Sequence, residues 1–231
     1  MKWVDEFRDP ALADRLAARI AAAVQPGRRY AFMEFCGGHT HAIARHGVAA
    51  RLPAAVRLIH GPGCPVCVLP VGRIDQAIAL AQRPGVMLAS YGDTLRVPAS
   101  GAVSLLQARA RGADVRMVTR TDEVLALARA NPGREVVFFA IGFETTTPPT
   151  ALLVKQAAAE GLRNLSVLCC HVLTPGAIVH ILQAPAEPPK AGRAPAEGPR
   201  AGVLLDGFIG PAHVSVLTGS RVYEPIVQAW R

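Results

Sequence analysis

The chain alternates short apolar runs rich in β-branched residues with helix-like stretches, and each run ends in glycine, proline, cysteine or histidine. Continuous apolar runs of this length are typical of strands in a parallel sheet that helices cover on both faces. The expected strands are 30–35, 56–59, 86–90, 115–118, 136–141, 165–169 and 203–209. The expected helices are 42–50, 71–82, 105–111, 150–159, 177–182 and 223–230. The pattern predicts an α/β protein built from Rossmann-like parallel sheets.

The order of these segments predicts two domains. Four strand candidates precede residues 119–121 and three follow, so we expect a first α/β domain at 1–119 and a second at 120–231. With one strand fewer, the second domain is expected to be incomplete at its C-terminus. Residues 184–200 are rich in Pro, Ala and Gly with mixed charge, a composition that buries too little apolar surface to offset its ordering entropy. We predict that they form a flexible, exposed insertion in the second domain.

Composition excludes several classes of protein. The 231 residues are 51% hydrophobic, which rules out a largely disordered chain. No window approaches the roughly 18 uncharged apolar residues of a membrane span. The start, MKWVDEFRDP, lacks the apolar region of a secretory signal, so we expect a cytoplasmic protein. Five cysteines are too few for a disulfide framework, and they predict metal or redox chemistry where they cluster.

The net charge of +8 is unevenly distributed along the chain. Residues 1–119 hold 15 Lys+Arg against 8 Asp+Glu, whereas 120–231 hold 10 against 9. No basic helix or arginine–aromatic interleaving is present, and aromatic residues make up 5% of the chain, so we expect no nucleic-acid partner. The basic N-terminal half favours an acidic protein or an anionic ligand.

Chemically unusual residues follow the first expected strand, at the edge where parallel α/β sheets form their sites. The segment CGGHTH (36–41) leads into a helix expected to begin around Thr40. A thiol beside backbone N–H groups and a helix N-terminus tends toward thiolate, the form that binds metal or attacks an electrophile. The segment therefore predicts a functional Cys36 accompanied by His39 and His41. The alternative is a buried cysteine on a glycine turn with two solvated histidines.

A C-x-x-C motif follows the second expected strand in HGPGCPVC (60–67). This spacing lets the sulfurs of Cys64 and Cys67 meet in one turn, as a redox disulfide or as half of a metal site. Pro70 suits the first turn of the next helix and would again place the thiols near a positive dipole end. The alternative is a pair of structural cysteines.

A carboxylate and three hydroxyls follow the expected strand 136–141 in GFETTTPPT (142–150). The loop is not a phosphate-binding P-loop, which would need more glycines and a lysine. Helix capping could explain Thr145 and Thr146, but it does not explain Glu144 so close to a strand end. We therefore expect Glu144, Thr145 and Thr146 to belong to a site.

Other polar residues at strand ends are open to either reading. His171 ends one expected strand, and His213 lies in GPAHVS (210–215) after another; each could be functional or structural. In YGDTLRVP (91–98), Asp93 and Arg96 could simply pair with each other. The adjacent cysteines 169 and 170 lie inside an apolar run, and we expect both to be inert core residues.

Six segments together closely resemble the HypD family of [NiFe]-hydrogenase maturation proteins. They are FCGGHTHAI, IHGPGCPVCVLPVGRID, YGDTLRVP, SLLQARARGADVR, VVFFAIGFETTTPPTA and DGFIGPAHVSVLTG, in the family's order across nearly the whole chain. The resemblance implies an assembly scaffold rather than a turnover enzyme. Such proteins, with a small HypC-type chaperone, hold the iron on which two cyanides and one carbon monoxide are installed. A HypE-type partner that carries a thiocyanate supplies the cyanide, and the finished group goes to the hydrogenase large subunit.

The resemblance also assigns roles to residues. Cys36 would be the thiolate that ligates the iron, with His39 close by, and His41 and His213 would belong to the same binding site. Cys64 and Cys67 would be the redox-active pair. The Glu144–Thr146 loop would line the same cleft, across which two α/β domains face each other.

The sequence departs from the family pattern in two places. The family continues well past Arg231, into a Cys-rich domain that holds a 4Fe–4S cluster, so we expect that cluster to be absent here. The chain reads Gly-Pro-Ala-His213 where the family usually reads A-P-G-H, which changes where the loop can adopt a positive φ. Two alternatives to an iron scaffold follow from the residues: a thiol–disulfide oxidoreductase that uses Cys64 and Cys67, and a zinc site made from Cys36, Cys64, Cys67 and one histidine.

Overall fold

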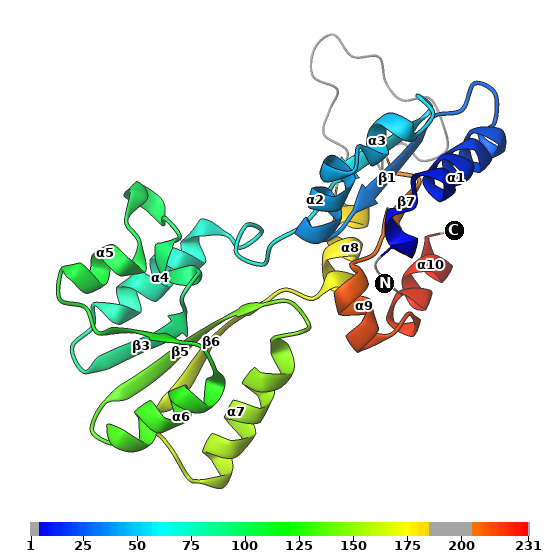
Figure 1. Cartoon of the computed structure of the whole chain (residues 1–231). Helices are drawn as coiled ribbons and strands as arrows, with labels where there is room; N and C mark the ends of the chain where they lie inside the picture. The colour runs from blue at the N-terminus through cyan, green and yellow to red at the C-terminus, as the bar shows by residue number, and fades with distance from the viewer. Residues whose placement is uncertain (1–4, 185–204, 231) are drawn as a thin grey trace. The chain divides into compact units, whose positions relative to one another are not determined.

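The computed structural model describes residues 5–184 and 205–230 (Figure 1). The strands are β1 (Tyr30–Glu34), β2 (Val56–His60), β3 (Val86–Tyr91), β4 (Val115–Val118), β5 (Glu135–Gly142), β6 (Leu165–His171) and β7 (Gly207–Ile209). The α-helices are α1 (Pro10–Ala23), α2 (Gly37–Arg45), α3 (Val48–Arg51), α4 (Val71–Ala81), α5 (Leu105–Ala110), α6 (Thr121–Ala130), α7 (Thr147–Ala159), α8 (Thr174–Gln183), α9 (Ala212–Thr218) and α10 (Glu224–Ala229). Short 3-10 helices lie at η1 (Glu6–Arg8), η2 (Thr94–Arg96), η3 (Ser100–Ala102) and η4 (Arg221–Tyr223). None of the helices in this described part of the chain is long and apolar enough to cross a membrane.

The larger sheet is parallel throughout and has the strand order β4-β3-β5-β6. In its central strand β5, every residue after Glu135 is buried. Alternate side chains of β5 enter two apolar clusters: Phe139 packs with residues of α4 and α5, whereas Phe138 packs with residues of α6 and α7. Figure 1 shows these helix pairs on opposite faces of the sheet. Burial on both faces explains why this strand reads as a continuous apolar run instead of an alternating one.

The smaller sheet has the strand order β2-β1-β7 and is also parallel. All five residues of β1 pair with β2, and the last three pair with β7. At the carboxyl end of β1, the buried ring of Phe35 meets Phe208 edge to face, with their centroids 5.7 Å apart. The carboxyl ends of all three strands therefore lie at one edge, where the segment that begins at Cys36 leaves the sheet.

The strand pairing corrects the predicted domain division at 119–121. Strand β3 pairs with β5 across that point, from Val86 opposite Glu135 to Ser90 opposite Phe139, so the predicted domains 1–119 and 120–231 share one sheet. Contacts instead divide the described residues between unit 1, within Met1–Gly63 and Leu182–His213, and unit 2, within Cys64–Ile181 and Val214–Arg231. The prediction assumed that strands near in sequence share a sheet. The sequence of a strand that is buried on both faces does not indicate which strands it pairs with.

The predicted α/β class with two parallel sheets is confirmed. The helix expected to begin around Thr40 begins earlier, at Gly37, and β1 ends at Glu34. The predicted insertion 184–200 lies outside the described residues apart from Ala184, as do residues 203 and 204 of the last predicted strand. The prediction that both adjacent cysteines belong to the core is half right, because Cys170 is buried but Cys169 is exposed.

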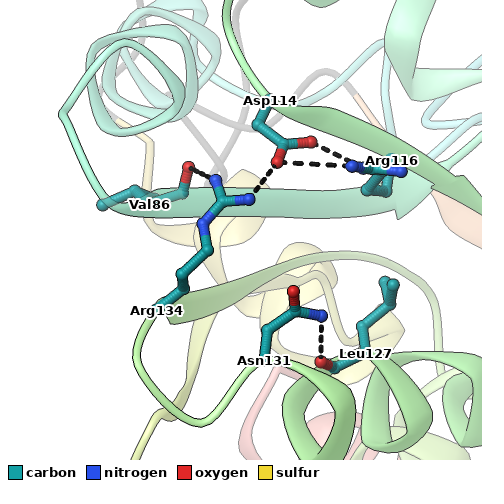
Figure 2. Close-up of polar contacts among 6 residues, drawn as sticks. All are labelled: Val86, Asp114, Arg116, Leu127, Asn131 and Arg134. Atoms are coloured by element: carbon teal, nitrogen blue, oxygen red, sulfur yellow. Dashed lines mark hydrogen bonds and ion pairs between the residues drawn. The ribbon is translucent and has the colours of Figure 1, made fainter.

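Paired charges join the amino ends of β3, β4 and β5 (Figure 2). The carboxylate of Asp114 accepts a hydrogen bond from Nε of Arg116 at 2.6 Å and lies 2.6 Å from Nη1 of Arg134. Nη2 of Arg134 donates to the carbonyl of Val86 at 3.2 Å. Hydrogen bonds from Arg116 hold the pKa of Asp114 below its ordinary value, and those from Arg134 add to the shift. At this end of the larger sheet, the charged side chains therefore neutralise one another and satisfy one another's hydrogen-bonding groups.

Candidate functional site

Cys36 lies at the junction between β1 and α2 and is one of two non-glycine residues with a positive φ in the described part of the chain. It is the N-cap of α2, with φ 108° and ψ 124°; Ala102 is the other residue with positive φ. A side chain in this region of backbone space costs on the order of 1–3 kcal/mol and persists only where neighbouring structure enforces it. Such strain is concentrated at functional sites, so this geometry singles out Cys36.

The loop after β2 supplies the contacts that enforce this conformation. The N–H of Cys36 donates to the carbonyl of Pro62, and the N–H of Gly37 donates to the carbonyl of Gly63, both at 3.1 Å. A Cβ at position 63 would lie 3.0 Å from the nitrogen of Gly37, and one at position 61 would lie 2.8 Å from the carbonyl oxygen of Glu34. The glycines of GPG (61–63) are therefore needed because the two loops approach backbone to backbone.

The sulfur of Cys36 lies 3.4 Å from Nδ1 of His213, within the distance of a hydrogen bond to sulfur. The thiol is half-buried. The N–H groups of His39 and Thr40 donate to the carbonyl of Cys36, which starts α2 at this residue. In unit 1, an imidazole able to hydrogen-bond to the sulfur of Cys36 therefore lies beside it at the N-terminus of α2.

The other two predicted histidines of unit 1 point elsewhere. The ring of His39 lines an apolar cavity of about 850 Å³ bounded by α1, β1, β2, α2 and α3, and its Nδ1 is buried without a partner among the described residues. His41 is exposed on α2. Neither ring hydrogen-bonds to the sulfur of Cys36; among the histidines of the described residues, His213 alone does.

A polar cluster that the sequence analysis did not identify lies below the Cys36 segment. Glu34, the last residue of β1, is fully buried. Its Oε1 accepts a hydrogen bond from the hydroxyl of Thr40 and one from Nδ1 of His60, the latter at 2.7 Å. The available signal was a glutamate inside the apolar strand YAFMEF, because a carboxylate in a core strand needs buried partners.

In unit 2, Cys64 and Cys67 form a single turn with a direct contact. The backbone N–H of Cys67 donates to the sulfur of Cys64 at 3.3 Å. The hydrogen bond with the Cys64 side chain, with smaller contributions from burial and charge, raises the pKa of Cys67. The C-x-x-C spacing therefore places the N–H of Cys67 against the sulfur of Cys64 within one turn. All five cysteines, each within the described residues, are free.

Glu144 is buried and joins two loops at the carboxyl edge of the larger sheet. Its Oε1 accepts the backbone N–H of Thr174 at 2.5 Å, and its Oε2 accepts the hydroxyl of Thr174 at 3.1 Å. Thr174 is the first residue of α8, so the carboxylate satisfies an N–H at the start of that helix. Glu144 is thus well placed to hold this edge together.

The two predicted threonines of this loop differ in their surroundings. Thr145 is exposed, whereas the hydroxyl of Thr146 donates to the carbonyl of Phe143 at 3.0 Å. A Cβ at Gly142 would lie 1.6 Å from Oγ1 of Thr146, so the tight turn requires glycine there. The hydroxyl of Thr146 therefore stabilises the turn, and that of Thr145 faces solvent.

Contacts in unit 2 show the surroundings of His171 and of Asp93, for which the sequence left two interpretations open. Nε2 of His171 lies 2.9 Å from the hydroxyl of Thr150, and burial lowers the pKa of His171, which supports a structural role. Asp93 does not pair with Arg96; its Oδ1 accepts the N–H of Thr94 at 2.8 Å and caps η2.

The thiols and histidines do not form a preassembled metal cage in either unit. Across residues 5–184 and 205–230, no group of three or more His, Cys, Asp or Glu side chains is arranged to hold a metal ion.

Comparison with known proteins points to one family. A family model named HypD, with the description "Hydrogenase formation hypA family", matches residues 11–231. The hydrogenase maturation factor HypD of Azotobacter vinelandii is 64% identical over 226 residues, which cover 97% of this chain and 56% of that protein. The hydrogenase maturation factor HypD of Escherichia coli (strain K12) is 42% identical over 232 residues, which cover 97% of this chain and 57% of that protein.

The same relationship holds for the hydrogenase maturation factor HypD of Cupriavidus necator, which is 58% identical over 97% of this chain and 56% of its own length. The chain thus spans a little more than half the length of these curated relatives. The family match covers nearly the whole chain and includes the residues that hold Cys36 in place. On these grounds the chain belongs to the HypD family.

Proposed function

We propose that this chain is part of a scaffold for [NiFe]-hydrogenase maturation, on which iron receives two cyanides and one carbon monoxide. Cys36 is the protein's ligand to that iron. The observation that carries the proposal is the placement of Cys36: a half-buried thiol at the start of α2, in a strained backbone, 3.4 Å from His213. Three relatives named as hydrogenase maturation factors support the same role.

The chemistry of the residues suits this cargo. Fe(II) with cyanide and carbon monoxide ligands is a soft centre, and thiolate is the soft ligand that proteins offer. A single thiolate leaves most coordination positions open for the incoming diatomic ligands. Backbone hydrogen bonds to the loop after β2 fix the position of Cys36, and the contact with His213 orients its sulfur.

The proposal includes three partners. A HypC-type chaperone shares the iron with Cys36, a HypE-type protein donates the cyanide, and the hydrogenase large subunit receives the finished group. The excess of Lys+Arg in residues 1–119 favours anionic cargo or acidic partners at this end of the chain. The Cys64–Cys67 pair supplies the two electrons that release cyanide from the thiocyanate: the dithiol becomes a disulfide, the S–CN bond breaks, and the two protons go to the partner's thiolate and to cyanide.

The test is co-expression of the tagged chain with a HypC-type partner, followed by anaerobic purification and infrared spectroscopy. Bands of iron-bound cyanide and carbon monoxide should copurify with the complex and should be lost in Cys36→Ala. Cys169→Ala is the matched control, because it removes a free, exposed thiol on β6 and should leave the bands intact. Bands that persist in Cys36→Ala would overturn the assignment.

A second candidate function is a thiol–disulfide oxidoreductase, which the hydrogen bond from the N–H of Cys67 to the sulfur of Cys64 favours. This function predicts turnover of a small disulfide substrate without iron, abolished by Cys64→Ala and unaffected by Cys36→Ala. The two functions are separated by those variants, because the scaffold depends on Cys36 and the oxidoreductase does not.

A further inference from the structure

Glu34 is a fully buried carboxylate that the proposed function does not use. One of its oxygens, Oε1, receives both available donors, the hydroxyl of Thr40 and Nδ1 of His60. The other oxygen, Oε2, is buried without a partner in the described part of the chain. An ionised carboxylate in the core is costly even when half of it is satisfied, so an apolar side chain would suit the core better. The position therefore calls for an explanation other than packing.

The two donors come from the elements that fix the backbone of Cys36. Thr40 lies in the first turn of α2, and its N–H donates to the carbonyl of Cys36. His60 is the last residue of β2, and the loop after it provides the carbonyls of Pro62 and Gly63 that accept the N–H groups of Cys36 and Gly37. Glu34 itself stands two residues before Cys36, so one carboxylate oxygen joins both ends of the strained segment.

We propose that Glu34, Thr40 and His60 form a clamp that holds Cys36 in its positive-φ conformation and keeps its sulfur beside His213. Glu34 is the positioning residue of this clamp, and it acts on Cys36 only through the backbone of α2 and the loop after β2. The assignment rests on the proposed function in one respect, namely that Cys36 is the working thiol. The geometric claim about the sulfur stands apart from iron.

A strained residue keeps its conformation only under opposing restraints. The bonds from Cys36 and Gly37 to the loop after β2 pull the segment from one side. Without an anchor on the other side, the first turn of α2 could shift and Cys36 could relax to a negative φ. The bond from Thr40 to Glu34 supplies that anchor, because β1 is fixed between β2 and β7.

The experiment measures whether Thr40 and His213 are coupled, although no hydrogen bond joins them. The rate constant for alkylation of Cys36 by iodoacetamide is followed by peptide mass spectrometry at one pH in the full chain. It is measured with His213 and with His213→Gln, in the wild type and in Thr40→Val. In the wild type, His213→Gln should change the rate by about twofold or more, the lower end of coupling within one network. In Thr40→Val the same substitution should have almost no effect.

Controls separate positioning from general loss of structure. Thr40→Ser keeps the hydroxyl and should restore the effect of His213→Gln. Thr119→Val removes a comparable bond, in which the hydroxyl of Thr119 donates to Glu123 at 2.6 Å, and should leave the effect unchanged. Hydrogen–deuterium exchange of the β1 amides reports unfolding of unit 1, because β1 is paired with β2 and β7 there and its amides should stay protected in every folded variant.

The outcomes distinguish this proposal from the iron scaffold. An equal effect of His213→Gln in the wild type and in Thr40→Val, or no rescue by Thr40→Ser, would overturn the clamp whatever happens to iron. If the coupling is found but the infrared bands survive Cys36→Ala, the clamp stands and the scaffold assignment falls. If the β1 amides lose protection in Thr40→Val, Glu34→Leu, which removes the accepting Oε1, replaces it in the same cycle, with the same expected loss of coupling.

Discussion

The sulfur of Cys36 lies 3.4 Å from Nδ1 of His213, although 177 positions separate the two residues. Their proximity follows from strand pairing in the smaller sheet. Glu34 of β1 lies opposite Ile209 of β7, and the N–H of Phe35 donates to the carbonyl of Ile209 at 3.0 Å. The pairing of the three residues of β7 with β1 therefore places the GPAHVS segment, which follows β7, at the carboxyl end of β1.

The strain at Cys36 predicts an unusual order of stabilities. Cys36→Gly should be more stable than Cys36→Ala by about 1 kcal/mol, because glycine adopts a positive φ without a Cβ conflict. Urea unfolding of both variants measures the difference. The same two substitutions at Cys169, which lies in β6, should show the opposite order, because glycine weakens a regular strand. Cys36→Ala as the more stable variant would show that the backbone there is unstrained.

Gly142 should tolerate no larger side chain. In Gly142→Ala the added methyl would overlap Oγ1 of Thr146, 1.6 Å away, and the turn must move at a cost of about 1–3 kcal/mol. Gly133→Ala is the control, since a Cβ there meets nothing within 4 Å. Thermal unfolding should show a clear loss for the first variant and little change for the second. Similar melting temperatures for the two would contradict the contact.

Glu144 should contribute to stability through Thr174. Glu144→Gln replaces one accepting oxygen with an amide group that cannot accept, so a buried donor of Thr174 loses its partner at a cost of about 1–3 kcal/mol. Glu160→Gln, on the exposed surface, should cost much less. Chemical denaturation measures both. An unchanged denaturation midpoint for Glu144→Gln would show that Glu144 does not stabilise the fold, which would leave its carboxylate available to a ligand.

The thiol of Cys67 should need a higher pH to react than an ordinary cysteine. Because the hydrogen bond with Cys64 raises the pKa of Cys67, its thiolate forms only above the ordinary range, and its alkylation at pH 8 should be slow. Cys64→Ala removes that bond, so the pKa of Cys67 should fall and its alkylation should accelerate. Rates measured from pH 7 to 10 by mass spectrometry test this. Identical pH profiles with and without Cys64 would contradict it.

Asp114 should make stability depend on acid. Its folded pKa is lowered, chiefly by the hydrogen bond from Arg116, so its contribution is present above the ordinary aspartate pKa of about 3.9 and is lost as the pH falls through the folded pKa. Asp114→Asn should therefore be less stable at neutral pH and should lose less stability on acidification. Denaturant midpoints measured from pH 7 to 2.5 give the pH dependence of stability for the wild type and for Asp114→Asn. The same dependence in both proteins would show that Asp114 does not contribute to it.

Local pattern was sufficient to predict most strands and the residues at their ends. Apolar runs bounded by glycine and proline mark β3 and β5 because burial on both faces leaves no alternation, and the motifs around Cys36, Cys64 and Glu144 are visible as departures from that pattern. The approach of Cys64 and Cys67 also follows from spacing, since four consecutive residues form a turn.

Tertiary structure decided what sequence order could not. The grouping of β3 with β5, and of β7 with β1, depends on pairing between segments that are distant in the sequence. The apolar runs themselves do not specify which strand pairs with which. The positive φ of Cys36 arises from two backbone hydrogen bonds to the loop after β2. The conformational propensities of the local residues do not predict it. The sequence by itself determined which residues have chemistry to offer. Only the fold determined that Cys36 meets His213 and that Glu34 lies beneath it with Thr40 and His60, because those contacts exist only once the strands have paired.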